Sequence, residues 1–464
     1  SVRKMEISSI AEKAVKYALK LGADAADAHV LRQKGILVQI ERGAIANESA
    51  QDIGGIGVRV LKDQAFGFAH IDKLEAKKVE QTVENAYHIA RASVPDPNNS
   101  LPSQKSLPKV RGIYEEKIAA LQVEDAVEMT KNMLEAALNY DSRVRVDMGG
   151  IEARVEEEAL VNTEGVNAVE KSTFLGVFIS GLARENGEVT SLTDEFGISH
   201  RLDLNVENIG TAFADKAVKQ FGAKKIESLE GTIILDFVPS AELIGSALAF
   251  GVRGDNVQRN ASPLRRKIGS ELAVPELSVI DDGLLEGGMM TKAFDGEGVP
   301  RKRTPILEKG VLRTFLFNTY TSKKEGTEST GNASRRQVGL FFAPSLPFES
   351  PPQLLPSNLI IESGNRTKQQ LIEEVEKGIF VGRFSGNIEV SNGNFSGSVK
   401  QGILIEKGEI KHPLIGTMIS GNSYELMKNI SGISKEFKTM ELGGAPSARS
   451  PMMRVEKVKI TGKT

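Results

Sequence analysis

Cysteine is absent from the 464-residue sequence. Its absence excludes disulfide bonds, thiolate nucleophiles and every metal site that uses a cysteine ligand. Histidine is scarce as well, and the sequence holds five, His29, His70, His88, His200 and His412. Because no two of them are close enough in sequence to form a local pair of ligands, they provide no histidine-based metal motif.

Neither sign of charge is in excess. Lysine and arginine total 59 against 61 aspartates and glutamates, which gives a net charge of −2. Such a balance supplies no long-range attraction to nucleic acid or anionic lipid, so we expect neither partner. Residues 1–20 lack the apolar core of a secretory signal, and no later segment approaches a membrane-spanning run. We therefore expect a cytoplasmic protein.

The length is too great for one ordinary core, so two or three domains are expected. Before Gly231, the order helix, strands, helix occurs twice, which suggests an internal duplication. Within the first set of strands, GGIGVRV (Gly54–Val60) is more typical of a sheet turn than of a phosphate loop. Residues 93–108 carry four prolines without an apolar period, which predicts a surface excursion or linker. After Gly251, short strands separated by glycine, asparagine and proline predict a curved antiparallel sheet or barrel.

The most informative stretch is residues 231–255, GTIILDFVPSAELIGSALAFGVRGD. Thr232–Phe237 has the length of a buried strand, Pro239 ends it, and Ser240 is expected to cap an apolar helix that runs to Gly251. Together with residues 278–336, this stretch resembles the TldD/PmbA (TldE) metallopeptidase family, in particular its PmbA/TldE branch. The resemblance implies an α+β fold, with an N-terminal α/β domain of mixed sheet and helices (1–225) and a C-terminal β-rich barrel-like domain (226–464).

A zinc motif, His-Glu-x-x-x-His, lies on this helix in the TldD branch of the family, and a C-terminal cysteine adds a ligand. Counted back from Gly254 and Asp255, its functional positions are Gly245, Ser246 and Phe250 in this sequence. Glycine has no ligand atom, serine is a poor general base, and a phenyl ring cannot coordinate zinc. Ser246 also lacks a nearby histidine that would activate it as a nucleophile. We therefore expect neither a catalytic residue nor a metal ligand at these positions.

Five polar residues are candidates for a peptide-binding cleft. Asp295 and Glu297, in FDGEGVP, would share one face of a strand as an acid/base pair, but the flanking glycines and proline favour a structural turn. Arg301 and Arg335 belong to short basic runs, which are typical of solvated surface, and the alternative is that they bind a peptide carboxylate through bidentate hydrogen bonds. The resemblance places residues 329–336, including Asn332, near the interdomain cleft.

By resemblance, we expect a non-catalytic PmbA/TldE-type subunit of a TldD-type zinc metallopeptidase complex that acts on small or unfolded peptides. The partner would hold the zinc, whereas this chain would hold no cofactor, would be inactive alone and would complete the walls of a shared chamber. One alternative is a self-assembling, homodimeric, protein-binding regulator without a peptidase role, in line with the family label "modulator of DNA gyrase". A second is an autonomous metallohydrolase with scattered ligands, which no motif in the sequence supports.

Overall fold

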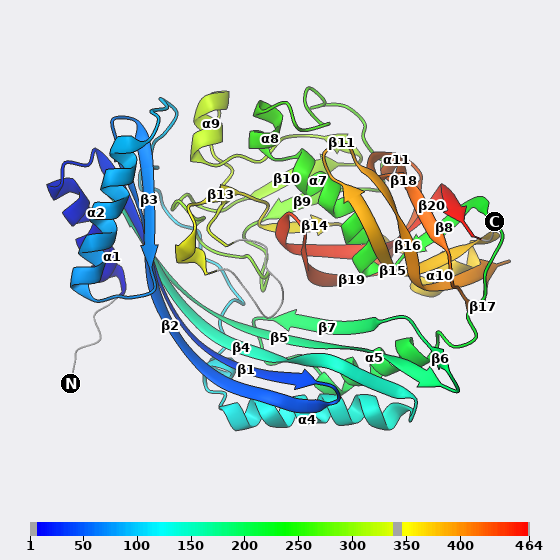
Figure 1. The fold of residues 1–464 in the computed structure, drawn as a ribbon. Coiled ribbons are helices and arrows are strands. Elements are labelled where there is room, and N and C mark those ends of the chain that lie inside the picture. The colour runs from blue at the N-terminus through cyan, green and yellow to red at the C-terminus, as the bar shows by residue number, and fades with distance from the viewer. Residues whose placement is uncertain (1–6, 337–345, 463–464) are drawn as a thin grey trace.

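Two large β-sheets organise the computed structural model, which describes residues 7–336 and 346–462 (Figure 1). The first sheet has seven strands, of which four are long and antiparallel: β1 (Ala25–Glu41), β2 (Ala44–Lys62), β4 (Val144–Asn162) and β5 (Asn167–Glu185). The shorter strands are β3 (Ala65–Ile71), β6 (Glu188–Val189) and β7 (Thr193–Ser199). Their order is β3-β2-β1-β4-β5-β6, and β7 also pairs with β5. The long central pair, β1 with β4, joins two hairpins into one continuous sheet.

The predicted duplication is present in the order of the elements. The first half (residues 7–92) places α1 (Ile7–Lys20) and α2 (Ala76–Ala92) against β1–β3, and the second half (residues 123–218) places α4 (Val123–Tyr140) and α5 (Val206–Val218) against β4, β5 and β7. Each half buries its own apolar core, around Val58 in the first and Phe213 in the second. Since the strand order is symmetrical about the β1–β4 pair, the halves present equivalent strands to the rest of the molecule.

The sheet turn predicted for Gly54–Val60 is wrong, because the whole segment lies inside β2 and is paired with β1. The glycines instead allow another segment of the chain to pack closely against β2. A Cβ built at Gly55 would lie 2.3 Å from Cζ of Phe348, which belongs to the short 3-10 turn η2 (Pro347–Glu349). Glycine inside a strand often marks such a contact with another segment.

The proline-rich segment 93–108 contains no helix or strand, as predicted. It bridges different parts of the molecule, since the Tyr320 hydroxyl donates to Asp96 and the Asn162 side-chain amide donates to the Pro102 carbonyl.

The second sheet contains a closed five-strand barrel, which confirms the barrel-like prediction. Its strands are β8 (Leu229–Leu235), β15 (Lys377–Glu389), β16 (Asn394–Glu406), β18 (Met418–Asn422) and β20 (Ala445–Thr461), and β20 closes the ring by pairing with β8. An open extension follows β20: β14 (Asn358–Ile361), β9 (Val279–Asp282), β10 (Arg303–Glu308) and β11 (Val311–Leu312). β17 (Glu409–Pro413) and β19 (Ile430–Leu442) pair with β16 and β20. The sheet is not wholly antiparallel as expected, because the β8–β15 and β14–β20 pairs are parallel.

Short elements complete the chain. They are α3 (Glu116–Ala119), α6 (Phe237–Ser240), the π-helical turn η1 (Ala241–Gly245), α7 (Ser246–Gly251), α8 (Gly254–Gln258), α9 (Thr319–Glu325), β12 (Ala333–Ser334), β13 (Gln353–Leu354), α10 (Lys368–Glu373) and α11 (Ser423–Lys428). α5, the last helix that packs on the first sheet, ends at Val218, and the first barrel strand begins at Leu229. The predicted boundary at 225/226 falls in the segment between them.

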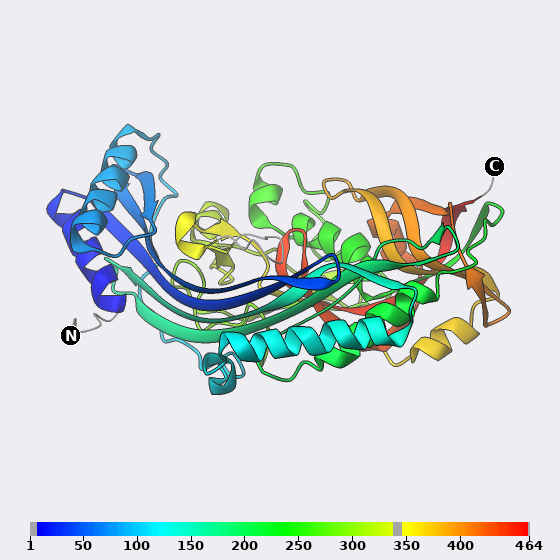
Figure 2. The same ribbon diagram turned by 60° about the horizontal axis from the view of Figure 1, so that its bottom comes forward.

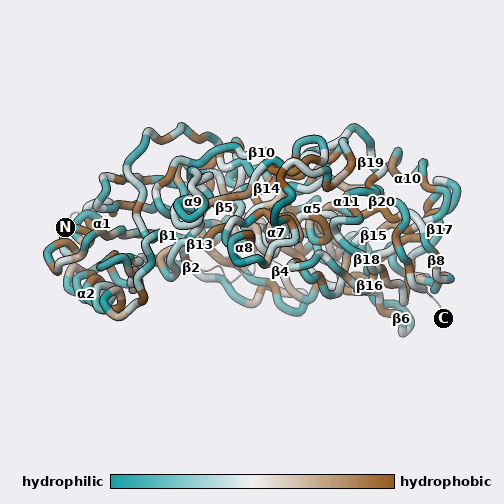
Figure 3. The backbone as a smooth tube through the Cα atoms, turned by 90° about the horizontal axis from the view of Figure 1, so that it is seen from above, coloured by the Kyte–Doolittle hydropathy of each residue, from teal (hydrophilic) through white to brown (hydrophobic). Residues whose placement is uncertain are grey.

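The first sheet curves around the second, with the barrel and its extension on the concave side and α4 and α5 on the convex side (Figures 1 and 2). The molecule is elongated, with α1 and α2 at one end and β8 and β17 at the other (Figure 3). Within residues 7–336 and 346–462, no helix has the length and apolar character needed to cross a membrane. Because the barrel and its extension lie on the concave side, that face of the first sheet contacts protein along much of its length.

Candidate functional site

The helix that the sequence singles out is continuous through α6, η1 and α7 and lies in the core of the second sheet. It begins four residues earlier than expected, since Asp236 rather than Ser240 is its N-cap and accepts a hydrogen bond from the Phe237 amide. Pro239 falls in the first turn, where a helix needs no amide donor, so it does not break the helix. The apolar run packs this helix against the barrel strands and places the three motif positions.

None of the three motif positions fits a zinc ion. Gly245 is buried, and a Cβ built there would lie 3.0 Å from Cδ2 of Leu442, so an imidazole would displace this neighbour. Ser246 offers a hydroxyl and half-buried Phe250 a phenyl ring, whereas zinc sites use thiolate, imidazole or carboxylate ligands. Among the described residues, no group of three or more histidines, aspartates or glutamates is arranged to hold a metal ion.

Glu242, one helical turn before Ser246, is a feature that sequence reasoning missed. Its Oε2 atom is buried and has no hydrogen-bond partner among the described residues. Burial raises the pKa of this carboxyl to about 7, against a partly offsetting attraction from Arg383. A buried carboxyl without a partner is costly to retain, which makes it a candidate for ligand contact.

The five predicted cleft residues lie together and are all buried: Asp295, Glu297, Arg301, Asn332 and Arg335. The turn interpretation of the first two is confirmed. Asp295 Oδ1 accepts hydrogen bonds from the amides of Glu297 and Val299, and its Oδ2 accepts one from the Ala333 amide. Burial, reinforced by the charge of Glu297, raises the pKa of Asp295 to about 6.

The solvated-surface interpretation of Arg301 and Arg335 is wrong, because both guanidinium groups are enclosed by protein. Arg301 donates to the Gly331 carbonyl at 3.2 Å, and Arg335 donates to Asp27 Oδ1 at 2.8 Å. Asn332 donates its side-chain amide to Asp281 at 2.6 Å. The arginines make contacts within the protein, and a peptide carboxylate as their ligand stays a prediction.

A buried ion network joins the first sheet to the second sheet's domain. Arg59 of β2 donates to Asp27 of β1 and, at 3.2 Å, to Glu297, while Arg335 donates to the other oxygen of Asp27. Burial alone would raise the pKa of Asp27, but the two guanidinium groups outweigh it and hold the pKa below its usual value. The carboxylate is therefore charged and fully paired.

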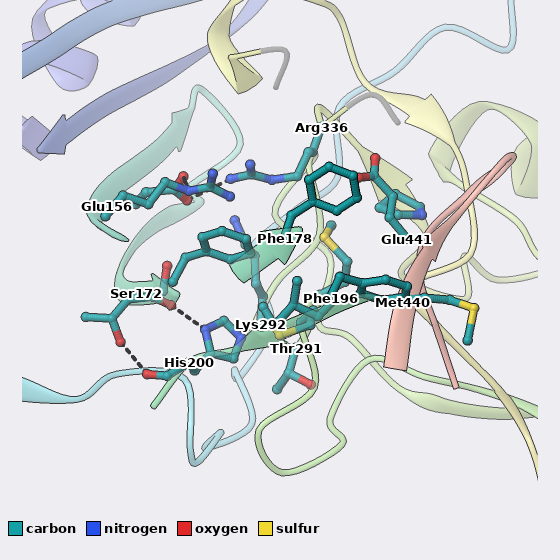
Figure 4. Close-up of a pocket in the computed structure, with 17 residues that line it drawn as sticks. Glu156, Ser172, Phe178, Phe196, His200, Thr291, Lys292, Arg336, Met440 and Glu441 are labelled. Atoms are coloured by element: carbon teal, nitrogen blue, oxygen red, sulfur yellow. Dashed lines mark hydrogen bonds and ion pairs between the residues drawn. The ribbon is translucent and has the colours of Figure 1, made fainter. Parts of the chain in front are cut away.

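An aromatic chamber of about 280 Å³ lies between the second half of the first sheet and the C-terminal part (Figure 4). We define it by its apolar lining, Phe174, Phe178, Phe196, Ile198, Met290 and Met440. Polar groups from both parts complete the wall. In Figure 4, Arg336 and Glu441 lie above the labelled phenylalanines Phe178 and Phe196, and His200 lies below Phe178. Its size is just below the usual range for small-ligand pockets.

Three charged groups of the chamber wall, Arg154, Glu156 and Arg336, are paired with one another, and Lys292 of the wall pairs with Glu158. Arg154 lies 3.9 Å from the centre of the Phe174 ring and forms ion pairs with Glu152 and Glu156, and Arg336 bonds Glu156 at 2.7 Å. Burial would raise the pKa of Glu156, but Arg336 and Arg154 lower it to about 2. An incoming ligand therefore meets mainly apolar surface and balanced charge.

Two further cavities adjoin the chamber. One of about 260 Å³ is lined by Glu242 and Ser246 and shares Met440 and Glu441 with the chamber. Another of about 570 Å³ is also lined by Glu242 and shares Phe196 with the chamber. The aromatic chamber thus adjoins two cavities that border the helix of residues 237–251. Phe174 and Phe178 lie on the same face of β5, because they are four residues apart in one strand. The sequence does not show that this face borders a cavity, since the cavity forms where two distant parts of the chain pack together.

The chain belongs to the PmbA/TldA metallopeptidase family. Family models of the C-terminal domain, the central domain and domain 1 match residues 228–462, 116–221 and 26–90. The chain is 24% identical over 457 residues to Metalloprotease PmbA of Escherichia coli O157:H7, and the match covers 96% of each protein. These matches confirm the resemblance inferred from residues 231–336.

Solved structures agree with this assignment. The crystal structure of TldE from Thermococcus kodakarensis superposes with a TM-score of 0.87 at 24% identity, over 98% of this chain and 100% of that chain. A Bacteroides thetaiotaomicron protein described as a "putative modulator of DNA gyrase" superposes with a TM-score of 0.85 at 25% identity, over 98% of each chain. The TldE-like fold therefore extends over nearly the whole chain.

Proposed function

We propose that this chain is a non-catalytic PmbA/TldE-type subunit of a TldD-type zinc metallopeptidase complex that acts on small or unfolded peptides in the cytoplasm. The observation that carries the proposal is the helix at residues 237–251. This helix is buried in the core of the second sheet, and its Gly245, Ser246 and Phe250 side chains offer none of the thiolate, imidazole or carboxylate ligands that zinc sites use. The zinc and its chemistry would belong to the partner subunit, and this chain would supply walls and peptide-binding surface.

The first test is the zinc content of the purified chain after dialysis against metal-free buffer, measured by elemental mass spectrometry. We expect far less than one zinc per chain. About one tightly held zinc per chain would contradict the proposal, because structural and catalytic zinc sites survive such dialysis.

The second test mixes the chain with a TldD-type subunit and measures association and hydrolysis of an unfolded peptide. We expect a stable complex whose activity exceeds that of either protein alone. The control is the same mixture with the motif glutamate of the TldD-type subunit replaced by glutamine, which should associate but not cleave. A mixture that neither associates nor gains activity would contradict the proposal.

A second candidate is a self-assembling protein-binding regulator without a peptidase role. It is supported by the description of the Bacteroides neighbour as a gyrase modulator. The near-neutral net charge favours a protein target over DNA. A stable homodimer that binds a topoisomerase but no peptidase subunit would favour this candidate over the first.

A further inference from the structure

Glu242 is the most unusual charged group that borders the cavities. Its Oε2 atom is shielded from solvent and lacks a hydrogen-bond donor among the described residues, although it lines two cavities that adjoin the aromatic chamber. Ser246 lies one turn further on the same helix face and borders the smaller cavity with it. A carboxylate in such a position gains strongly from a ligand that brings its own positive charge.

Four cations line the larger cavity together with Glu242: Lys216, Lys368, Arg383 and Lys438. Lys368 Nζ lies 4.3 Å from the centre of the Phe380 ring. Arg383 lies 3.8 Å from Asp194 and donates to the Leu192 carbonyl at 3.1 Å. Lys216 and Lys438 both bind Glu195. The protein therefore supplies Glu242 with no direct counter-ion among the described residues, and a ligand ammonium group would be its first one.

The surface beside Glu242 includes apolar side chains that carry no charge. Phe196 lines both the chamber and the larger cavity, and Met440 lines both the chamber and the smaller one. The chamber thus adjoins both cavities that Glu242 lines. The site combines a negative charge with an aromatic pocket, and it lies on the helix that lost the zinc motif.

We propose that Glu242 and the aromatic chamber bind the N-terminal end of a peptide, with the free α-ammonium group at Glu242 and a large apolar side chain in the chamber. The proposal deepens the proposed function, since it rests on a peptide as the ligand. It assigns to this chain a recognition site for peptide N-termini, which the altered zinc helix provides in place of a metal.

The test measures binding to the full chain alone by isothermal titration calorimetry at pH 7, where an α-amino group with a pKa of about 7.7–8.0 is mostly protonated. The probe is phenylalanyl-phenylalanine amide, which has one free ammonium group and no carboxylate, and the comparison peptide is its N-acetylated form. We expect acetylation to weaken binding about tenfold or more, because it removes the charge that Glu242 would pair with. Phenethylamine, which has an aromatic ring and an ammonium group but no peptide bond, tests whether the site recognises a peptide or any aromatic amine. If it binds as tightly as the peptide, the assignment to peptides is overturned.

Two matched variants locate the effect. Glu242→Gln keeps the shape but removes the charge, so we expect the free and acetylated peptides to bind it with equal, weak affinity. Glu436→Gln makes the same change at an exposed residue lining the larger cavity, and we expect it to keep the preference for the free amine. Phe178→Ala should weaken both peptides and keep their ratio. The proposal fails if Glu242→Gln, shown to be folded by circular dichroism, retains the full preference or if wild type binds neither peptide at millimolar concentration.

These outcomes are independent of the complex. A chain that discriminates the two peptides but never associates with a TldD-type subunit would support the site and contradict the subunit function. A chain that associates and restores hydrolysis but shows no preference for the free amine would do the reverse.

Discussion

The two halves of the first sheet share one architecture but differ in what covers their concave faces. In the first half, fully buried Phe348 packs onto β2, where Gly55 and Gly57 leave room for it. In the second half, β5 presents Phe174 and Phe178 to a chamber of about 280 Å³. The face of the first half is thus filled at Phe348, although a cavity of about 540 Å³ lined by Arg59, Phe66 and Phe68 lies elsewhere on this half, whereas the face of the second half opens on the aromatic chamber. The comparison indicates that the Phe348 contact secures the two parts of the protein together and that the chamber is available for an apolar ligand.

One carboxyl of each half illustrates a difference in electrostatic environment. Asp27 of the first half is paired with two arginines, which hold its pKa below the usual value against the effect of burial. Glu170 of the second half accepts one amide hydrogen bond from Ala293, and burial raises its pKa to about 7. Asp27 is charged and links the two parts of the protein, and Glu156 of the second half is likewise held charged by its arginines, whereas Glu170 titrates near neutral pH. The predictions below break or sharpen this contrast.

Replacing Asp27 with asparagine should have the largest effect. The variant leaves Arg335 buried without a carboxylate and Arg59 with Glu297 alone, so we expect a loss of about 3–5 kcal/mol in the free energy of unfolding. Urea denaturation followed by circular dichroism measures it. The control, Asp24→Asn, removes an exposed ion pair to Lys62 and should cost less than about 1 kcal/mol. Equal losses in the two variants would show that the Asp27 network does not hold the parts together.

Truncation of Phe348 to alanine tests the filled face directly. The side chain is fully buried, so its removal should leave a cavity beside Gly55 and cost about 3 kcal/mol. Phe178→Ala is the matched change in the second half. Phe178 is half-buried and already borders open space, so its loss should be clearly smaller, about 1–2 kcal/mol. If both truncations cost the same in denaturation experiments, the contrast between a filled and an open face is wrong.

Gly57→Ala approaches the same contact from β2. An added Cβ would lie 2.3 Å from the Phe348 carbonyl oxygen, a backbone atom that cannot rotate away, so we expect destabilisation of about 2 kcal/mol. Gly443→Ala is the control, because nothing lies within 4 Å of its added Cβ and its φ is not in the left-handed region. A neutral Gly57→Ala variant would mean that the β2–Phe348 contact is loose.

Local patterns predicted what depends on neighbouring residues. The buried strand and helix of residues 231–255, the barrel and the duplicated order of elements could all be inferred from the sequence. The absence of a zinc site at Gly245, Ser246 and Phe250 stays a prediction. The turn at Asp295 also followed from its flanking glycines. These features arise from apolar spacing and turn residues within one segment.

Long-range packing explains the failures. Arg335 was expected at the surface because its partner Asp27 lies 308 residues away in sequence. The glycines of β2 were taken for a turn because Phe348, which they accommodate, comes from another domain. The chamber and Glu242 were missed for the same reason, since a cavity is a property of how two surfaces meet and has no spacing pattern of its own.

The last prediction concerns how the free energy of unfolding depends on pH. The pKa of Glu170 is raised to about 7 by burial, with Lys292 partly offsetting it and Glu158 adding to it. A carboxyl with a raised native pKa destabilises the folded state increasingly from its unfolded pKa, about 4.3, up to about pH 7. Glu170→Gln should therefore match wild type near pH 4.5 and become more stable by about 2 kcal/mol above pH 7, a value reduced because the side chain is only partly buried.

The measurement is urea denaturation of Glu170→Gln and wild type at half-unit steps from pH 4.5 to 8. Glu157→Gln, which alters an exposed pair with Lys171, is the control and should change stability by less than about 1 kcal/mol throughout. The amide oxygen of glutamine can still accept the Ala293 hydrogen bond, so the comparison isolates the charge. A stability difference that does not vary with pH would show that Glu170 is ionised in the folded protein over the whole range. Glu170 would then resemble Asp27, whose charge is held by neighbouring guanidinium groups.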